Sequence, residues 1–177
     1  MVVDGHSSSI GLSEILAYIG KSHAPVLSAY VTLHRAIMSD PAGLTPAECE
    51  MIAVIASRLN QCSYCVDVHM AQLLSHLAPP RSAQFGHQLL ADLSSVSLSD
   101  RERALLAHAA KLTTSPGEIG ASDLHKLRET GLSDPEIEHA TFVTASLNLA
   151  NRVAMITGEV LKENLATSAG LTDVSAD

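Results

Sequence analysis

Three helix-start signals constrain the fold of this chain more than any other feature. Each is a capping box, in which a hydroxyl side chain caps an early backbone amide and a carboxylate three residues later reaches back to the cap. A leucine precedes every cap, as a hydrophobic staple requires. The caps are Thr45 with Glu48, Ser99 with Glu102, and Ser133 with Glu136. Three such signals, and no lasting alternation typical of strands, predict an all-α fold.

The apolar segments between these signals indicate where the helices lie. The run at 51–56 is apolar on every side, which predicts a helix buried all round. Proline, glycine and serine clusters separate the other segments. Further helices are expected at about 10–20, 25–38, 61–76, 83–92, 104–110, 121–129, 140–150 and 150–163.

Length and composition favour one domain, residues 1–177, with a core over about 10–165. The ends, 1–9 and 166–177, are expected to be flexible. The chain is 46% hydrophobic but only 3% aromatic, so small apolar residues must pack helices closely. Such a surplus of apolar residues also predicts a homo-oligomer.

The charge and cysteine content exclude several classes of protein. A net charge of −8 offers no footprint for nucleic acid or an anionic membrane. No apolar run approaches the ~18 residues that span a bilayer, and no signal peptide is recognisable. We therefore expect a cytoplasmic protein, in which paired cysteines indicate catalysis or metal binding.

Two segments of the chain are similar to each other. Residues 44–60 align without gaps to 132–148, with the leucine, two glutamates and a final Leu-Asn pair shared. The similarity predicts one helical unit used twice. The alternative is a chance coincidence of two amphipathic helices that share a capping box.

The chemistry is concentrated just after the first of these segments. Asn60 is expected to cap a new helix, which would place Cys62 in its first turn and Cys62, Cys65 and His69 on one face. The helix dipole would lower the pKa of a thiol at that end. Two thiols at this spacing can close a disulfide, and an imidazole beside them can shuttle protons. Redox chemistry is the favoured interpretation.

Other interpretations stay open at this point. A zinc-binding module needs four ligands, and this motif supplies three. Two buried cysteines could also simply pack against a satisfied histidine. Glu50, beside the buried run, could exchange protons or could stabilise its helix start from solvent. Accessory residues on one later helix face could line the site or form a capping network: Asn148, Asn151 and Arg152.

The pattern Glu50, Cys62-Ser63-Tyr64-Cys65 and His69 resembles the AhpD-like branch of the carboxymuconolactone decarboxylase superfamily. The Asn-x-Cys-x-Tyr-Cys-x3-His form is similar to its peroxidase-related subgroup. The resemblance covers about residues 25–158. It implies a helical bundle of duplicated units, assembled as trimers or hexamers. It also implies an antioxidant enzyme that reduces alkyl hydroperoxides or H2O2 with a dithiol or protein reductant, and no cofactor or metal is expected.

The resemblance implies that Cys65 attacks the peroxide, Cys62 resolves, and Glu50 and His69 relay protons. The dipole argument favours Cys62 as the more acidic thiol. Tyr64 stands where AhpD has a histidine, and a phenol is a poor proton shuttle at neutral pH, so turnover is expected to be weak or the electron donor different. The alternatives are a non-catalytic redox-sensing or scaffold oligomer, a decarboxylase-type enzyme and a zinc-binding module.

Overall fold

The computed structural model describes residues 10–41, 43–79, 85, 88–89 and 96–168. Over these segments the chain forms α-helices and one short 3-10 helix, Pro116–Glu118, and no strand is found in them. The all-α prediction is confirmed. In the same segments, no helix combines the length and the hydropathy needed to cross a membrane. The helices are α1 (Leu12–Met38), α2 (Pro46–Leu59), α3 (Ser63–His76), α5 (Asp100–Thr114), α6 (Ala121–Glu129) and α7 (Asp134–Ser168).

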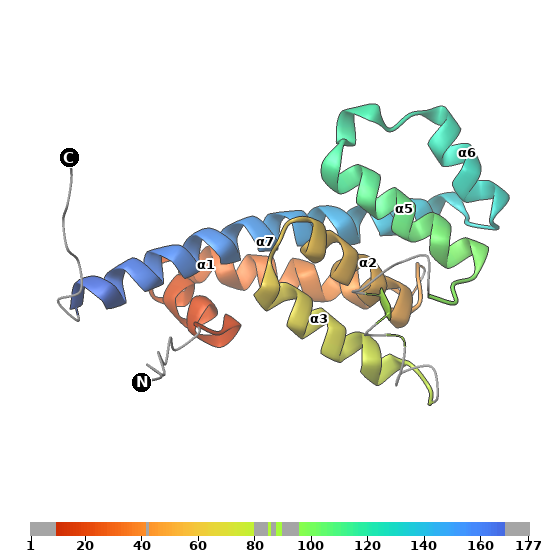
Figure 1. Cartoon of the computed structure of the whole chain (residues 1–177). Coiled ribbons are helices and arrows are strands. Elements are labelled where there is room, and N and C mark those ends of the chain that lie inside the picture. The colour runs from red at the N-terminus through yellow and green to blue at the C-terminus, as the bar shows by residue number, and fades with distance from the viewer. Residues whose placement is uncertain (1–9, 42, 80–84, 86–87, 90–95, 169–177) are drawn as a thin grey trace, which may run out of the picture.

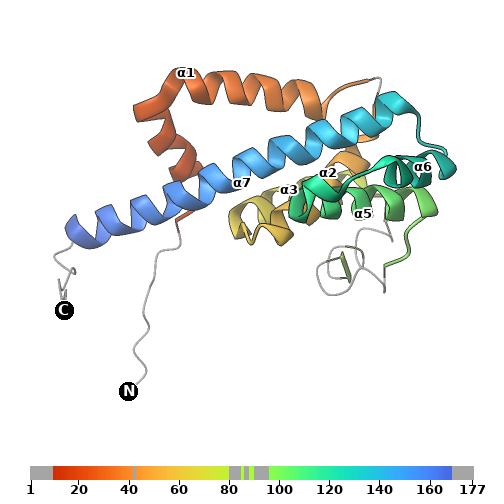
Figure 2. The same ribbon diagram turned by 90° about the horizontal axis from the view of Figure 1, so that it is seen from above.

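Helix α7 organises the molecule. It packs against α1 on one side and against α2 and α5 on the other (Figures 1 and 2). The main core lies on the α2 side, where residues 51–56 are at most 2% exposed. The helix predicted to be buried all round is therefore confirmed. A smaller apolar cluster, which contains Cys62 and Cys65, lies between α1, α3 and α7.

Helix α1 is kinked, and the kink shapes the side of the molecule that carries the dithiol. His23 leaves the helical region with φ −137° and ψ 41°, two residues before Pro25. Proline has no amide hydrogen to donate and restricts the residue before it, so the helix bends there. The two helices expected at 10–20 and 25–38 are thus the two arms of one bent element. Figure 2 shows the short first arm turning back toward α7.

The three predicted helix starts are confirmed. Thr45 and Ser99 each exchange hydrogen bonds with the glutamate three residues on, which completes a capping box, and Ser133 donates from its amide and its hydroxyl to Glu136. The first and last of these glutamates, Glu48 and Glu136, both accept from Arg101, at 2.7 Å and 2.6 Å. One guanidinium therefore ties together the starts of the two similar segments.

The ends of the two similar segments also meet. Asn60 donates from Nδ2 to Asn148 Oδ1 at 2.8 Å, and these residues occupy the same position in each segment. After this point the segments differ: α2 ends, whereas α7 continues to Ser168. The helices expected separately at 140–150 and 150–163 are one, and 166–168 belong to it rather than to a flexible end.

Several sequence predictions lie wholly or partly outside the described residues. The ends 1–9 and 169–177 are not described. Of the helix expected at 83–92, the structure describes Phe85, Gln88 and Leu89, which are helical. Phe85 and Leu89 belong to the main core.

Candidate active site

A tight turn between α2 and α3 sets up the dithiol. The amide of Gln61 donates to the carbonyl of Arg58 at 3.0 Å, and the amide of Cys62 donates to the carbonyl of Ser57 at 2.9 Å. These two bonds define a Schellman motif, whose central residue must be left-handed. That residue is Gln61, with φ 60°, where glycine is usual. The turn ends one helix and starts the next within three residues.

The expectation that Asn60 caps the dithiol helix is therefore wrong. Asn60 is the C-cap of α2, and its side chain bonds across to α7 instead. Cys62 is the N-cap residue of α3, two residues later than the expected cap at Asn60. The physical reason is the Schellman turn, which uses the amides of residues 61 and 62 to close α2. Cys65 consequently lies at the third helical position.

Cys62 and Cys65 lie in direct contact as free thiols. Their sulfurs are 2.7 Å apart, and no disulfide is formed. The hydrogen bond with Cys65 lowers the pKa of Cys62 to about 7, against the opposing effect of burial. The same bond and burial raise the pKa of Cys65. When the pair loses a proton, the negative charge therefore falls on Cys62, at the helix N-terminus, and Cys65 keeps its proton.

His69 is held by Glu50. Its Nδ1 lies 2.8 Å from Glu50 Oε2, and the two residues are 9% and 8% exposed. Glu50 thus faces the dithiol helix rather than solvent, which answers the question left open by the sequence. A carboxylate accepts hydrogen bonds, so Nδ1 carries the imidazole hydrogen and Nε2 is left as an acceptor. Glu50, both thiols and His69 come together as one group.

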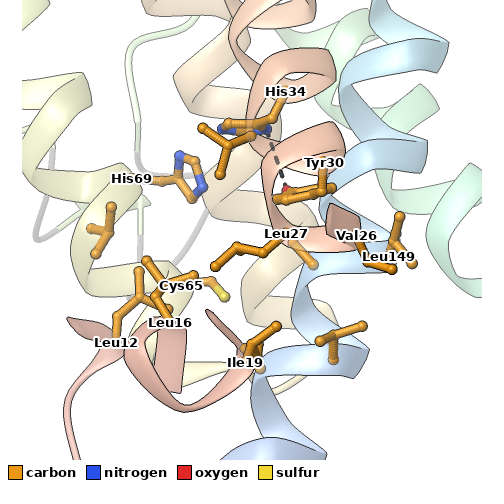
Figure 3. Close-up of a pocket in the computed structure, with 15 residues that line it drawn as sticks. Leu12, Leu16, Ile19, Val26, Leu27, Tyr30, His34, Cys65, His69 and Leu149 are labelled. Atoms are coloured by element: carbon orange, nitrogen blue, oxygen red, sulfur yellow. Dashed lines mark hydrogen bonds between the residues drawn. The ribbon is translucent and has the colours of Figure 1, made fainter. Parts of the chain in front are cut away.

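The group opens on an apolar cavity of about 260 Å³. Figure 3 shows the Cys65 sulfur pointing into this space, with His69 on the same wall. Cys65 is 4% exposed, whereas Cys62, behind it, is fully buried. Apolar side chains from both arms of α1, from α3 and from α7 form most of the lining: Leu12, Leu16, Ile19, Val26, Leu27, Val31, Val68, Leu149, Ala150, Val153 and Ala154.

Two polar residues on α1 also line this cavity, and sequence reasoning did not find them. Tyr30 Oη lies 3.4 Å from His34 Nδ1 (Figure 3). The same nitrogen is 3.2 Å from Ser146 Oγ on α7. Burial lowers the pKa of His34 and raises that of Tyr30. The available signal was the four-residue spacing of Tyr30 and His34, which puts them on one helix face.

The accessory candidates lie outside the cavity lining. Tyr64 packs against Gly158, where an added Cβ would lie 3.1 Å from the tyrosine oxygen. Arg152 donates to the backbone and side-chain oxygens of Asn148, which links α2 to α7. Asn151 is fully buried and accepts from Ser57. The three residues on α7 thus bond α7 to the end of α2.

The third cysteine, Cys49, takes no part in the dithiol group. Cys49 is fully buried in the main core, and burial raises its pKa to about 12. In the part of the chain that the structure describes, no three His, Cys, Asp or Glu side chains are grouped to hold a metal ion.

Comparisons with known proteins agree with this geometry. The family model described as "Carboxymuconolactone decarboxylase family" matches residues 24–84. An alkylhydroperoxidase AhpD core structure from Ralstonia eutropha JMP134, an uncharacterized peroxidase-related protein, is 31% identical over 77% of this chain and 70% of that one, with a TM-score of 0.72. No match was found among curated proteins.

A second uncharacterized peroxidase-related protein, from Silicibacter sp. TM1040, is 28% identical over 82% of this chain and 81% of its own, with a TM-score of 0.70. The debrominase Bmp8, at 19% identity and a TM-score of 0.69, shares the fold alone. These similarities and the dithiol motif define an AhpD-like helical fold. The chain belongs to the AhpD-like, peroxidase-related group of the carboxymuconolactone decarboxylase superfamily.

Proposed function

We propose that this protein is a thiol-dependent peroxidase that reduces organic hydroperoxides. The observation that carries the proposal is the position of Cys65, which opens on the cavity beside His69 while Cys62 lies 2.7 Å behind it. A peroxide in the cavity reaches one sulfur, and the second sulfur is placed to resolve the product. This arrangement matches the roles that the family resemblance implies.

The acidity of Cys62 and the accessibility of Cys65 point to different sulfurs. Cys62 is the more acidic thiol, but it is fully buried, and a peroxide cannot reach it without displacing Cys65. Attack therefore falls to Cys65, whose proton must first be removed. His69 Nε2 is the acceptor for that proton, because Glu50 fixes the imidazole hydrogen on Nδ1.

The catalytic cycle follows from these positions. The Cys65 thiolate attacks the terminal oxygen of the hydroperoxide, which breaks the O–O bond and leaves a sulfenic acid on Cys65 and an alcohol. The Cys62 thiolate then displaces hydroxide from that sulfur, which takes a proton and leaves as water, and a disulfide forms. A dithiol or protein reductant supplies two electrons and two protons to restore both thiols.

The cavity supports organic peroxides over H2O2 as substrates. Its lining is apolar apart from Tyr30, His34 and the dithiol group, so an alkyl or aryl substituent gains hydrophobic contact there. A homo-oligomer is proposed as well, because large apolar side chains of α7 are exposed, Ile156 at 68% and Leu149 at 52%. Light scattering would show three or six copies of the 18.6 kDa chain if the family assembly holds.

Steady-state consumption of cumene hydroperoxide with a dithiol donor tests the proposal. Cys65→Ser and Cys62→Ser should abolish turnover, while Cys49→Ser, a substitution in the main core, should leave it intact. Glu50→Gln should reduce kcat/KM about 10- to 100-fold, because His69 loses its orienting carboxylate. A wild type that forms the disulfide reversibly but consumes no peroxide would instead support the redox-sensor hypothesis.

A further inference from the structure

Two histidines face the cavity from different helices, and their hydrogen bonds give them opposite roles. His69 comes from α3 and His34 from α1, and their rings meet edge to face with centroids 6.0 Å apart. His69 uses Nδ1 to donate to a carboxylate, so its Nε2 is an acceptor. It is the base of the site.

His34 also makes its hydrogen bonds through Nδ1, but its partners are hydroxyl groups. They are Tyr30 Oη at 3.4 Å and Ser146 Oγ at 3.2 Å. A phenol is a stronger acid than a neutral imidazole N–H, so the phenol donates and Nδ1 accepts. This assignment places the single hydrogen of the neutral ring on Nε2. Burial lowers the pKa of His34, which keeps the ring neutral.

The position of His34 brings this donor close to the reacting sulfur. His34 and Cys65 line the same cavity, and the His34 ring lies against the ring of His69, which is one helical turn after Cys65. Tyr30, the partner of His34, lies near enough to Cys65 for a charge there to raise its pKa. Figure 3 shows Tyr30 and His34 across the cavity from the Cys65 side chain. A peroxide between them would meet the sulfur on one side and the imidazole on the other.

We propose that His34 is a catalytic residue, whose Nε2–H donates a hydrogen bond to the oxygen that leaves when Cys65 attacks a hydroperoxide. The inference rests on the proposed function. The sulfur–oxygen bond forms as the O–O bond breaks, the sulfur loses two electrons to the peroxide, and negative charge develops on the alkoxide. The proton that His69 took from Cys65 neutralises the alkoxide, so a thiol and a hydroperoxide become a sulfenic acid and an alcohol. His34 keeps its hydrogen and stabilises the charge as it forms.

The sequence of the dithiol explains why the donor comes from α1. Tyr64, between the two cysteines, packs against Gly158 and does not line the cavity. The residue between the thiols therefore cannot reach the leaving oxygen. His34 supplies the donor from the opposite wall.

The choice of peroxide tests this role. When the sulfur attacks cumene hydroperoxide, the leaving group is a strongly basic alkoxide. Perbenzoic acid is of similar size, but its leaving group is a weakly basic carboxylate that needs no donor. In His34→Leu, kcat/KM should fall about 100-fold for cumene hydroperoxide and less than about 3-fold for perbenzoic acid. His34→Gln, whose amide can donate from a similar position, should recover part of the loss. His76→Leu, at an exposed position at the end of α3, should change neither value.

The outcomes separate the inference from the proposed function. If wild type consumes neither peroxide, the peroxidase proposal fails and the role of His34 with it. If wild type is active and His34→Leu loses both activities equally, only the inference is overturned, because a structural defect would not depend on the leaving group. Nitrogen NMR of the wild type gives a test that needs no variant: hydrogen on Nε2 of His34 supports the role, and hydrogen on Nδ1 overturns it.

Discussion

Replacing Cys65 with alanine should remove most of the acidity of Cys62. The hydrogen bond between the two sulfurs, 2.7 Å apart, is the largest cause of the lowered pKa of Cys62. Once Cys62 is ionised, the Cys65 thiol is the donor that stabilises its charge. Alanine offers no such donor, and the burial that opposes ionisation stays in place.

The size of the effect follows from the pKa. With a pKa of about 7, Cys62 is about half thiolate at pH 7. If the pKa returns to its ordinary value of 9.0, the thiolate fraction at pH 7 falls to about 1%, a loss of about 50-fold. Cys49 does not interfere, because burial raises its pKa to about 12. A Cys65→Ala variant therefore reports on Cys62 alone below about pH 10.

The assay is the ultraviolet absorbance of the thiolate, followed against pH. Wild type should show one thiolate appearing with a midpoint of about 7, and Cys65→Ala should shift that midpoint up by about two pH units. Cys65→Ser keeps a hydroxyl donor and should lie between them. A Cys65→Ala midpoint still at about 7 would refute the reasoning and assign the acidity to the helix N-terminus.

Two further predictions concern stability. Gln61→Gly should raise the free energy of unfolding by about 0.5–1 kcal/mol, because glycine adopts φ 60° without strain. Denaturant titration measures this gain, and a Gln61→Ala control should show none. Arg101→Met should lower the free energy of unfolding by about 2 kcal/mol at pH 7, because Glu48 and Glu136 lose their shared partner. Arg101 lowers the pKa of both carboxyls, to about 2 for Glu136. The difference in free energy of unfolding between wild type and Arg101→Met should therefore be present at neutral pH and shrink as the pH falls from about 4.3 toward 2. A difference that stays constant with pH would contradict this account.

Local signals predicted much of the fold. A capping box is specified by residues three positions apart, so Thr45, Ser99 and Ser133 could be found in the sequence and all three start helices. The buried helix α2 followed from an apolar run with no polar face. The boundary at Asn60 was wrong because the same residue type can begin or end a helix. Whether Asn60 begins or ends a helix depends on the left-handed turn at Gln61, and a glutamine does not predict such a turn.

The site was only partly predictable for a similar reason. Glu50, Cys62, Cys65 and His69 lie within twenty residues, and their spacing could be interpreted from helical geometry. The cavity could not, because its other walls come from α1 and α7, far away along the chain. The hydrogen bond between His34 and Ser146 joins residues 112 positions apart. Such a contact depends on how three helices pack, which no local pattern specifies.

The two similar segments explain why chemistry is found in only one of them. Each begins with a hydroxyl residue bonded to a glutamate that Arg101 holds, and each brings an asparagine to the same contact, Asn60 with Asn148. In the second segment the helix continues past that asparagine, so the following residues have paired amides. In the first, the strained turn at Gln61 interrupts the helix and creates a new N-terminus at Cys62, where a thiolate is stabilised. The break in the helix is therefore part of the redox centre, and restoring a continuous helix there would remove the smaller contribution that the backbone amide of Cys65 makes to the lowered pKa of Cys62.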